Sequence, residues 1–87
     1  MEQMVNAIDT ELQDRLQNNH SVIDSIYFGG GTPSLLTIGQ INRLTETIFK
    51  FGSISEEVEI TFEMNPDDFN VHYIRQLKET AVNRISI

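Results

Sequence analysis

The sequence predicts an α/β fold in which parallel strands alternate with helices. Apolar residues recur at helical spacing in three segments, and short runs rich in β-branched and aromatic residues follow each segment. The segment between the first two runs is longer than the dozen residues that a crossover between parallel strands needs. The order helix, strand, helix, strand, helix, strand therefore favours a parallel sheet with right-handed crossovers.

Residues 1–20 form the first expected element, an amphipathic helix. Its apolar face is assigned to Met1, Met4, Val5, Ile8, Leu12 and Leu16. Its opposite, polar face is assigned to Glu2, Asp9, Glu11, Asp14 and Arg15. The helix is expected to end near residues 18–20, Asn-Asn-His, which tolerate the backbone angles of a helix C-terminus.

A short buried strand is expected at residues 26–28, Ile-Tyr-Phe, because this run is too short for a helix. Three glycines follow it at once, at positions 29–31. Pro33 lacks a backbone N–H and pushes Thr32 towards extended or turn angles, so the strand cannot continue. A loop therefore follows the C-terminal end of the first strand.

The second helix has the clearest start signal in the chain. Thr37 and Gln40 fit a capping box, in which each side chain accepts a hydrogen bond from the backbone N–H of the other residue. Leu36 and Ile41 are placed as a hydrophobic staple across this start. The helical spacing of apolar residues then continues to Gly52, where the helix is expected to end.

The second strand is expected at residues 58–64, where apolar and polar side chains alternate. Val58, Ile60, Phe62 and Met64 alternate with Glu59, Thr61 and Glu63. In a doubly wound sheet, both strand faces are buried and the strands read as continuous apolar runs. One polar face instead fits the lumen of a wide or incomplete barrel. The predicted fold is therefore an α-β-α-β-α-β fragment of a β/α (partial TIM-type) barrel with parallel strands.

A third helix is expected to begin at Asn70 as its N-cap, with Phe69 and Ile74 in staple positions. Its apolar face is assigned to Ile74, Leu77 and Ala81. Residues 83–87 then form a third strand. This accounts for all 87 residues as a single unit, with a leading helix at 1–20.

Composition excludes several classes of function. Thirteen acidic and six basic side chains give a net charge of −7, and the basic residues do not cluster, which argues against nucleic acid and anionic membranes as partners. No apolar run approaches the roughly 18 residues of a membrane span, so a cytoplasmic chain is expected. The absence of cysteine excludes Cys-ligated zinc, an iron–sulfur cluster held by this chain, and thiol catalysis. His20 and His72 lie far apart, so no metal site is expected.

Ligands of β/α folds bind at the C-terminal ends of the strands, which here are residues 29–34 and 63–68. Glycines remove every Cβ and let the backbone approach a bound molecule, although a tight turn at positive φ is an alternative. An inward carboxylate at Glu63 is costly unless a ligand, cation or hydroxyl pairs with it, the alternative being a solvated acid in an open lumen. Asp67 and Asp68 suit a structural role at a helix start. Ser34 lacks the context of a hydrolase nucleophile.

Three blocks of residues 24–87, namely IYFGGGTPSLL, EITFEMNPDDF and LKETAVNRISI, together resemble one family. They resemble the radical S-adenosylmethionine enzymes of the oxygen-independent coproporphyrinogen III oxidase type. The resemblance implies that Gly30, Gly31 and Thr32 contact the methionine end of S-adenosylmethionine, and that Glu63 also contacts this cofactor. It implies no catalytic residue in this chain. The NPDD segment at 65–68 is more similar to the heme chaperone branch of the family.

Two departures from the family pattern shape the expected function. The family holds its iron–sulfur cluster through a Cys-x-x-x-Cys-x-x-Cys segment before the first block, whereas this chain has no cysteine. The family also continues beyond residue 87, and Ala81 stands where it usually has glycine. The resemblance therefore implies an inactive internal fragment, whose parent protein binds S-adenosylmethionine, an iron–sulfur cluster, and porphyrinogen or heme.

Two other hypotheses remain open at this stage. The chain could be a stand-alone module that holds a nucleotide or phosphate at residues 29–32, although it lacks both the Gly-Lys-Ser/Thr and the dinucleotide-binding glycine patterns. It could also be a structural unit that forms a homo-oligomer, since a barrel slice leaves both outer strands unpaired.

Overall fold

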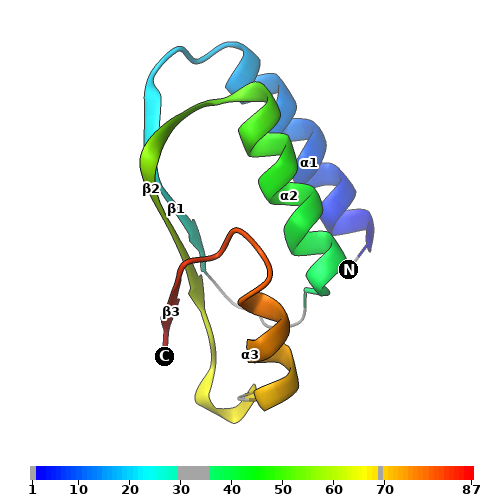
Figure 1. The fold of residues 1–87 in the computed structure, drawn as a ribbon. Helices are drawn as coiled ribbons and strands as arrows, with labels where there is room; N and C mark the ends of the chain where they lie inside the picture. The colour runs from blue at the N-terminus through cyan, green and yellow to red at the C-terminus, as the bar shows by residue number, and fades with distance from the viewer. Residues whose placement is uncertain (1, 30–35, 69) are drawn as a thin grey trace.

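A computed structural model describes residues 2–29, 36–68 and 70–87 (Figure 1). Its elements, in chain order, are α1 (Glu2–Gln17), β1 (Val22–Phe28), α2 (Ile38–Phe51), β2 (Ser53–Glu63), the 3-10 helix η2 (Pro66–Asp68), α3 (Val71–Leu77) and β3 (Arg84–Ser86). Apart from the short helix η2, this is the predicted order of helices and strands.

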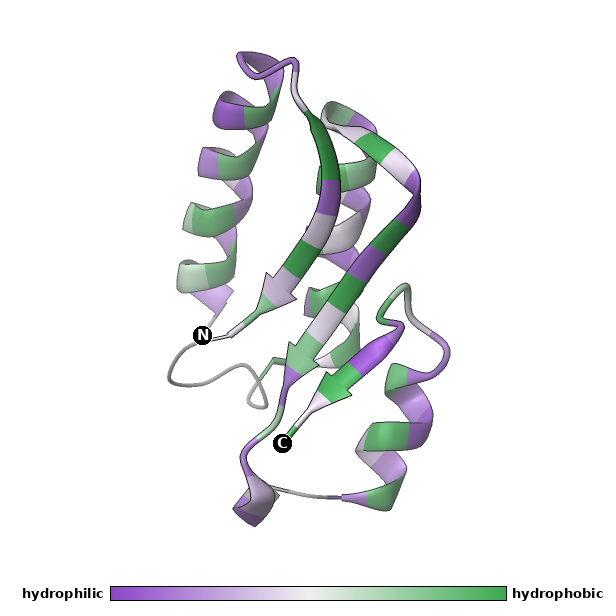
Figure 2. Ribbon diagram, turned by 90° about the vertical axis from the view of Figure 1, so that its left-hand side faces the viewer, coloured by the Kyte–Doolittle hydropathy of each residue, from purple (hydrophilic) through white to green (hydrophobic). Residues whose placement is uncertain are grey.

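The three strands form one parallel sheet in the order β1-β2-β3. All three helices lie on the same side of this sheet (Figure 1), so its other face is open. In Figure 2 the strands pass in front of α2, and hydrophilic and hydrophobic residues alternate along β2. The arrangement confirms the predicted fold class, a partial β/α barrel with an open sheet.

The register of the strands explains this difference between the two faces. Ile26 pairs with Ile60, and Phe28 pairs with Phe62, which places these apolar side chains together on the helix side. Tyr27 pairs with Thr61 and therefore lies on the open face. Because successive side chains of a strand point to opposite faces, Glu59 and Glu63 share the open face with Thr61.

The core lies between the sheet and the helices, with Phe62 near its centre. The Phe62 side chain is fully buried, and its ring centroid lies 6.0 Å from those of both Phe28 and Tyr73. The buried apolar cluster consists of Val5, Leu36, Ile41, Leu44, Ile60, Phe62, Met64, Leu77 and Val82. The helices α1, α2 and α3 and the strands β1 and β2 contribute residues to this cluster or pack against it, whereas β3 does not.

The predicted start of α2 is confirmed in detail. The Thr37 hydroxyl accepts a hydrogen bond from the Gln40 N–H at 3.1 Å, and the Gln40 side-chain oxygen accepts one from the Thr37 N–H at 2.9 Å. Leu36 and Ile41, the predicted staple, are both buried in the core cluster. At the other end, the N–H of Gly52 donates to the carbonyl of Ile48 and closes the helix.

Both long strands begin earlier than the sequence predicts. They start at Val22 and Ser53, which pair with each other, and the register shifts between Ile23 and Ser25. The early part of β2 reads Ser-Ile-Ser-Glu-Glu, a polar run that carries no strand signal of its own. Pairing with β1 holds it in the sheet, so tertiary context overrides local propensity here.

The third helix begins as predicted but ends earlier. The Asn70 side chain accepts hydrogen bonds from the N–H groups of His72 and Tyr73, as an N-cap does, while Phe69 lies outside the described residues. The helix ends at Leu77, so the assignment of Ala81 to its apolar face is wrong, and Ala81 is exposed.

The short bend after α3 explains this end. The Thr80 hydroxyl donates to the carbonyl of Leu77 at 2.6 Å and accepts from the N–H of Val82 at 3.1 Å. The bend turns Val82, rather than Ala81, into the core, where only 9% of its surface is exposed. An alternative set of hydrogen bonds thus replaces the last turn of the helix that the apolar spacing predicts.

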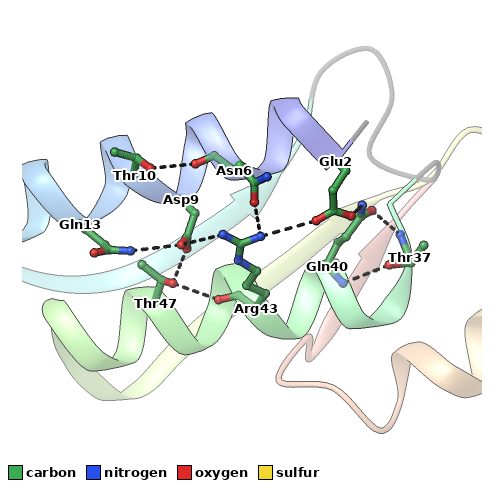
Figure 3. A network of polar contacts seen from close by, with 9 residues as sticks. All are labelled: Glu2, Asn6, Asp9, Thr10, Gln13, Thr37, Gln40, Arg43 and Thr47. Carbon is green, nitrogen blue, oxygen red and sulfur yellow. Dashed lines mark hydrogen bonds and ion pairs between the residues drawn. The ribbon is translucent and has the colours of Figure 1, made fainter.

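The placement of Asp9 on the exposed face of the first helix is also wrong. Asp9 is only 6% exposed, because α2 covers it with hydrogen-bond donors (Figure 3). The Thr47 hydroxyl donates to one carboxylate oxygen, and the other accepts from Gln13 Nε2 at 3.1 Å and faces Arg43 at 3.4 Å. The hydrogen bond from Thr47 is the main cause of a lowered pKa at Asp9, which Gln13 and Arg43 reinforce against the opposing effect of burial.

This contact is part of a polar network that joins α1 to α2 along their length. The residues drawn in Figure 3 are Glu2, Asn6, Asp9, Thr10, Gln13, Thr37, Gln40, Arg43 and Thr47. Arg43 also contacts Asn6 and lies 3.5 Å from Glu2, and Gln40 Nε2 donates to Glu2 at 3.1 Å. The first helix is therefore fixed to the second by polar groups as well as by the buried Val5.

Candidate functional site

The C-terminal ends of the strands meet at one edge of the sheet. Gly29 follows β1 directly, Glu63 is the last residue of β2, and Ser86 is the last residue of β3. The N–H of Met64 donates to the carbonyl of Ser86 at 2.8 Å, which holds the ends of β2 and β3 together. The parallel topology thus brings residues far apart in sequence to the edge where β/α folds bind ligands.

Glu63 and Tyr27 form a pair on the open face at this edge. The Tyr27 hydroxyl donates a hydrogen bond to Glu63 Oε2. Glu63 is half-buried, whereas 59% of Tyr27 is exposed. The hydrogen bond to Glu63 is the main cause of a raised pKa at Tyr27, and partial desolvation and the carboxylate charge act in the same direction.

Gly29 leaves the space that this pair occupies. A Cβ atom at position 29 would lie 2.1 Å from Cε1 and 2.6 Å from Cδ1 of the Tyr27 ring, and 3.2 Å from Glu63 Oε2. The φ angle of Gly29 is outside the left-handed region, so the alternative of a turn at positive φ does not explain this first glycine. What position 29 requires is the absence of a side chain.

The remainder of the open face is polar, and its side chains contact one another across the strands. Arg84 on β3 forms an ion pair with Glu59 on β2, with Nη1 and Oε1 2.8 Å apart. Thr61 lies between Tyr27 and Arg84 in the register and is only 7% exposed. The prediction of a polar face is confirmed for these residues, although cross-strand neighbours cover Thr61.

An apolar groove of about 450 Å³ lies on the other side of β1, between this strand and helices α1 and α2. It is lined by Met4, Ile8, Leu12, Ile26, Tyr27, Phe28, Gly29, Leu36, Leu44 and Ile48. Its lining offers no charged group, so it does not suit the charged end of a ligand. It reaches the strand-end site at Tyr27 and Gly29.

Of the four predicted cofactor-binding residues, the structure places Glu63 at the strand-end site. Gly30, Gly31 and Thr32 lie outside the described residues. Asp67 is exposed in η2, and the residue that caps α3 is Asn70. In the described parts of the chain, no three His, Cys, Asp or Glu side chains gather closely enough to hold a metal ion.

Tyr27 is the site residue that the sequence reasoning missed. The sequence predicts only a buried strand at this position, whereas the structure shows Tyr27 exposed beside Glu63. A signal was present, because Tyr27 lies between Ile26 and Phe28. If those two side chains face the helices, the alternation of a strand places Tyr27 on the polar face.

Comparisons with known proteins agree with this fold. The chain is 39% identical, over 91% of its length, to the heme chaperone HemW of Buchnera aphidicola from Acyrthosiphon pisum. It is 38% identical, over 74% of its length, to the oxygen-independent coproporphyrinogen III oxidase of Synechocystis. These matches span 21% and 14% of the two relatives, so the chain corresponds to a small part of each. No protein-family model matches the chain.

A solved structure gives the same result. The radical SAM enzyme coproporphyrinogen III oxidase (HemN) of Escherichia coli superposes with a TM-score of 0.85 over 97% of this chain and 20% of its own, at 25% identity. The fold and the sequence therefore define a segment of a radical S-adenosylmethionine protein. Within that class, the chain belongs to the family of the HemN coproporphyrinogen oxidases and HemW heme chaperones, as the sequence blocks predict.

Among the helices of residues 2–29, 36–68 and 70–87, none combines the length and the apolar character that crossing a membrane requires.

Proposed function

We propose that this chain, as one part of a radical S-adenosylmethionine barrel, contributes Gly30, Gly31, Thr32 and Glu63 to the cofactor site. The observation that supports this best is the half-buried Glu63 carboxylate, which lies on the open face at the end of β2, beside Gly29, where a Cβ would displace the Tyr27 ring. Both features lie at the edge where ligands bind in β/α folds.

The chemistry of these groups fits the methionine end of S-adenosylmethionine. Its ammonium group needs carboxylate or carbonyl acceptors, and its carboxylate needs N–H or hydroxyl donors. Glu63 supplies a carboxylate acceptor, and the backbone of Gly30 and Gly31 together with the Thr32 hydroxyl would supply the donors. When bound, this cofactor supplies hydrogen-abstracting radical chemistry. The iron–sulfur cluster does not fit the residues present, because the chain has no cysteine to ligate it.

For the whole protein, we propose a role in heme or porphyrin metabolism. The support comes from the relatives, one named a heme chaperone and the other a coproporphyrinogen oxidase. Their names differ in the partner, heme for one and porphyrinogen for the other. The NPDD segment at residues 65–68 favours the chaperone. The cytoplasmic location expected from the sequence remains a prediction.

Replacing Glu63 by glutamine tests the proposed site. The side chain keeps its shape but loses the charge that would pair with the cofactor ammonium, so we expect the Kd for S-adenosylmethionine to rise about tenfold. The measurement is an NMR titration of the ¹⁵N-labelled chain. Glu57→Gln is the matched control, because Glu57 is an exposed acid on the same strand, and its affinity should stay within twofold of the original. The proposal would be contradicted if the unmodified chain did not bind S-adenosylmethionine, or if Glu63→Gln and Glu57→Gln bound it with equal affinity.

We also infer that copies of the chain associate through the outer strands of the sheet. In the described fold, β1 and β3 each have one neighbouring strand, and Val22 and Ile87 near them are 66% and 70% exposed. Unpaired strand edges with apolar residues favour pairing between chains. Sedimentation velocity at rising concentration is expected to show a dimer or a larger species, and a monomer at every concentration would refute this.

A further inference from the structure

We propose that Tyr27 is a positioning residue for cofactor binding, because its hydroxyl holds the Glu63 carboxylate in the orientation that receives the cofactor ammonium. This inference rests on the proposed S-adenosylmethionine site and adds to it a residue outside the Gly30–Thr32 loop and Glu63. Tyr27 acts through Glu63 and makes no contact with the cofactor in this proposal.

The strand register makes the pair possible. Tyr27 on β1 lies directly opposite Thr61 on β2, and Glu63 is two residues further along β2 on the same face. This diagonal position on the same face of the neighbouring strand is within reach of a long aromatic side chain. The hydroxyl of Tyr27 therefore reaches Glu63 Oε2 along the sheet surface.

Gly29 allows the Tyr27 ring to take this position. The ring occupies the space that a side chain at position 29 would fill, with Cε1 only 2.1 Å from where a Cβ would be. Any other residue would displace the ring and, with it, the hydroxyl. The first glycine of the triplet thus has a specific role, which is to let Tyr27 lie across the end of β1.

Packing alone does not account for this arrangement. Since 59% of Tyr27 is exposed, burial by itself does not hold its ring in one orientation. The hydrogen bond to Glu63 adds a directional contact that orients the ring. The Tyr27 hydroxyl is protonated through the neutral range, as any tyrosine is, and the hydrogen bond to Glu63 raises its pKa further, so it remains a donor.

The pair leaves acceptor capacity for a ligand. A carboxylate has two oxygens with about four lone-pair sites, and the hydroxyl of Tyr27 uses one site on Oε2. Among the described residues, Oε1 of Glu63 receives no hydrogen bond. A carboxylate fixed in this way loses less conformational freedom when a ligand binds, and this is how a positioning residue raises affinity.

Tyr27→Phe tests the inference, because it removes only the hydroxyl. We expect its Kd for S-adenosylmethionine to rise about three- to fivefold, while its Kd for 5′-methylthioadenosine, which has no ammonium group, stays unchanged. Gly29→Ala is the second variant: it retains the hydroxyl but displaces the ring, and it should weaken S-adenosylmethionine binding to a similar extent. Thermal unfolding of each variant checks that the fold is retained.

A titration without the cofactor gives an independent measurement. The chain has two tyrosines, and ¹³C NMR can follow the phenol of each. In Glu63→Gln, the pKa of Tyr27 should fall towards its ordinary value, whereas the pKa of Tyr73, raised by burial, should not change.

The outcomes separate this inference from the proposed function. If Glu63→Gln weakens S-adenosylmethionine binding but Tyr27→Phe does not, Tyr27 has no positioning role and the proposed site stands. The inference would also be refuted if the pKa of Tyr27 were the same in Glu63→Gln as in the unmodified chain. If the unmodified chain does not bind S-adenosylmethionine, the proposed function fails, and the inference fails with it.

Discussion

Replacing Phe62 by alanine is expected to lower the free energy of unfolding by about 3–5 kcal/mol. The side chain is fully buried and contacts two other rings, Phe28 from β1 and Tyr73 from α3. Its loss would leave a cavity between β2, β1 and α3. Neither β1 nor α3 can fill this cavity without giving up other contacts in the core. The total free energy of unfolding of a domain of this size is only about 4–13 kcal/mol, so the variant would lose a large part of it.

Urea unfolding followed by circular dichroism measures this loss, and Phe49→Ala is the matched control. It removes the same side chain from α2, where Phe49 is 43% exposed, so the expected loss is less than about 1 kcal/mol. Similar losses in the two variants would show that Phe62 is not central to the core. The result also bears on the site, because Phe62 precedes Glu63. The burial of Phe62 against the helices directs Glu63 to the open face.

Local patterns in the sequence predict the order of the helices and strands, the start of α2 and the two faces of β2. The capping box at Thr37 depends on residues three apart, and the alternation from Val58 to Met64 depends on neighbours two apart. Both patterns are contained within a single element, and both appear in the structure as predicted. The fold class followed from them, since a polar strand face fits the lumen of a barrel better than a sheet covered by helices on both sides.

The predictions that were wrong for Asp9 and missing for Tyr27 concern partners far apart in the chain. Asp9 looks like an exposed helix residue until α2 brings Thr47, 38 residues later, against it. Tyr27 looks like a buried strand residue until β2 brings Glu63, 36 residues later, to the same edge. Neither pair has a spacing that identifies it, because a tertiary contact depends on the register of whole elements. Side chains with both polar and apolar parts are therefore the hardest to assign from sequence.

The polar contacts of Asp9 lead to the second large prediction, for Asp9→Ala. The variant loses the hydrogen bonds from Thr47 and Gln13 and the ion pair with Arg43, so the free energy of unfolding at neutral pH should fall by about 2–3 kcal/mol. The loss should be concentrated in the packing of α1 on α2, because the contacts with Thr47 and Arg43 join the two helices. The contact with Gln13 lies within α1. Amide hydrogen exchange should then be faster in α1 than in the sheet.

The pH dependence of this loss identifies its electrostatic origin. The pKa of Asp9 is lowered in the folded chain, so its ionised form stabilises the fold above its ordinary pKa of about 4 and loses this effect as the pH falls further. The difference between the original chain and Asp9→Ala should therefore shrink below pH 4. Asp14→Ala removes an exposed acid from the same helix, so it matches the changes in net charge and helix propensity and should cost less than about 0.5 kcal/mol. A difference for Asp9→Ala that did not change with pH would mean that side-chain volume, rather than the ionised carboxylate, stabilises the contact between α1 and α2.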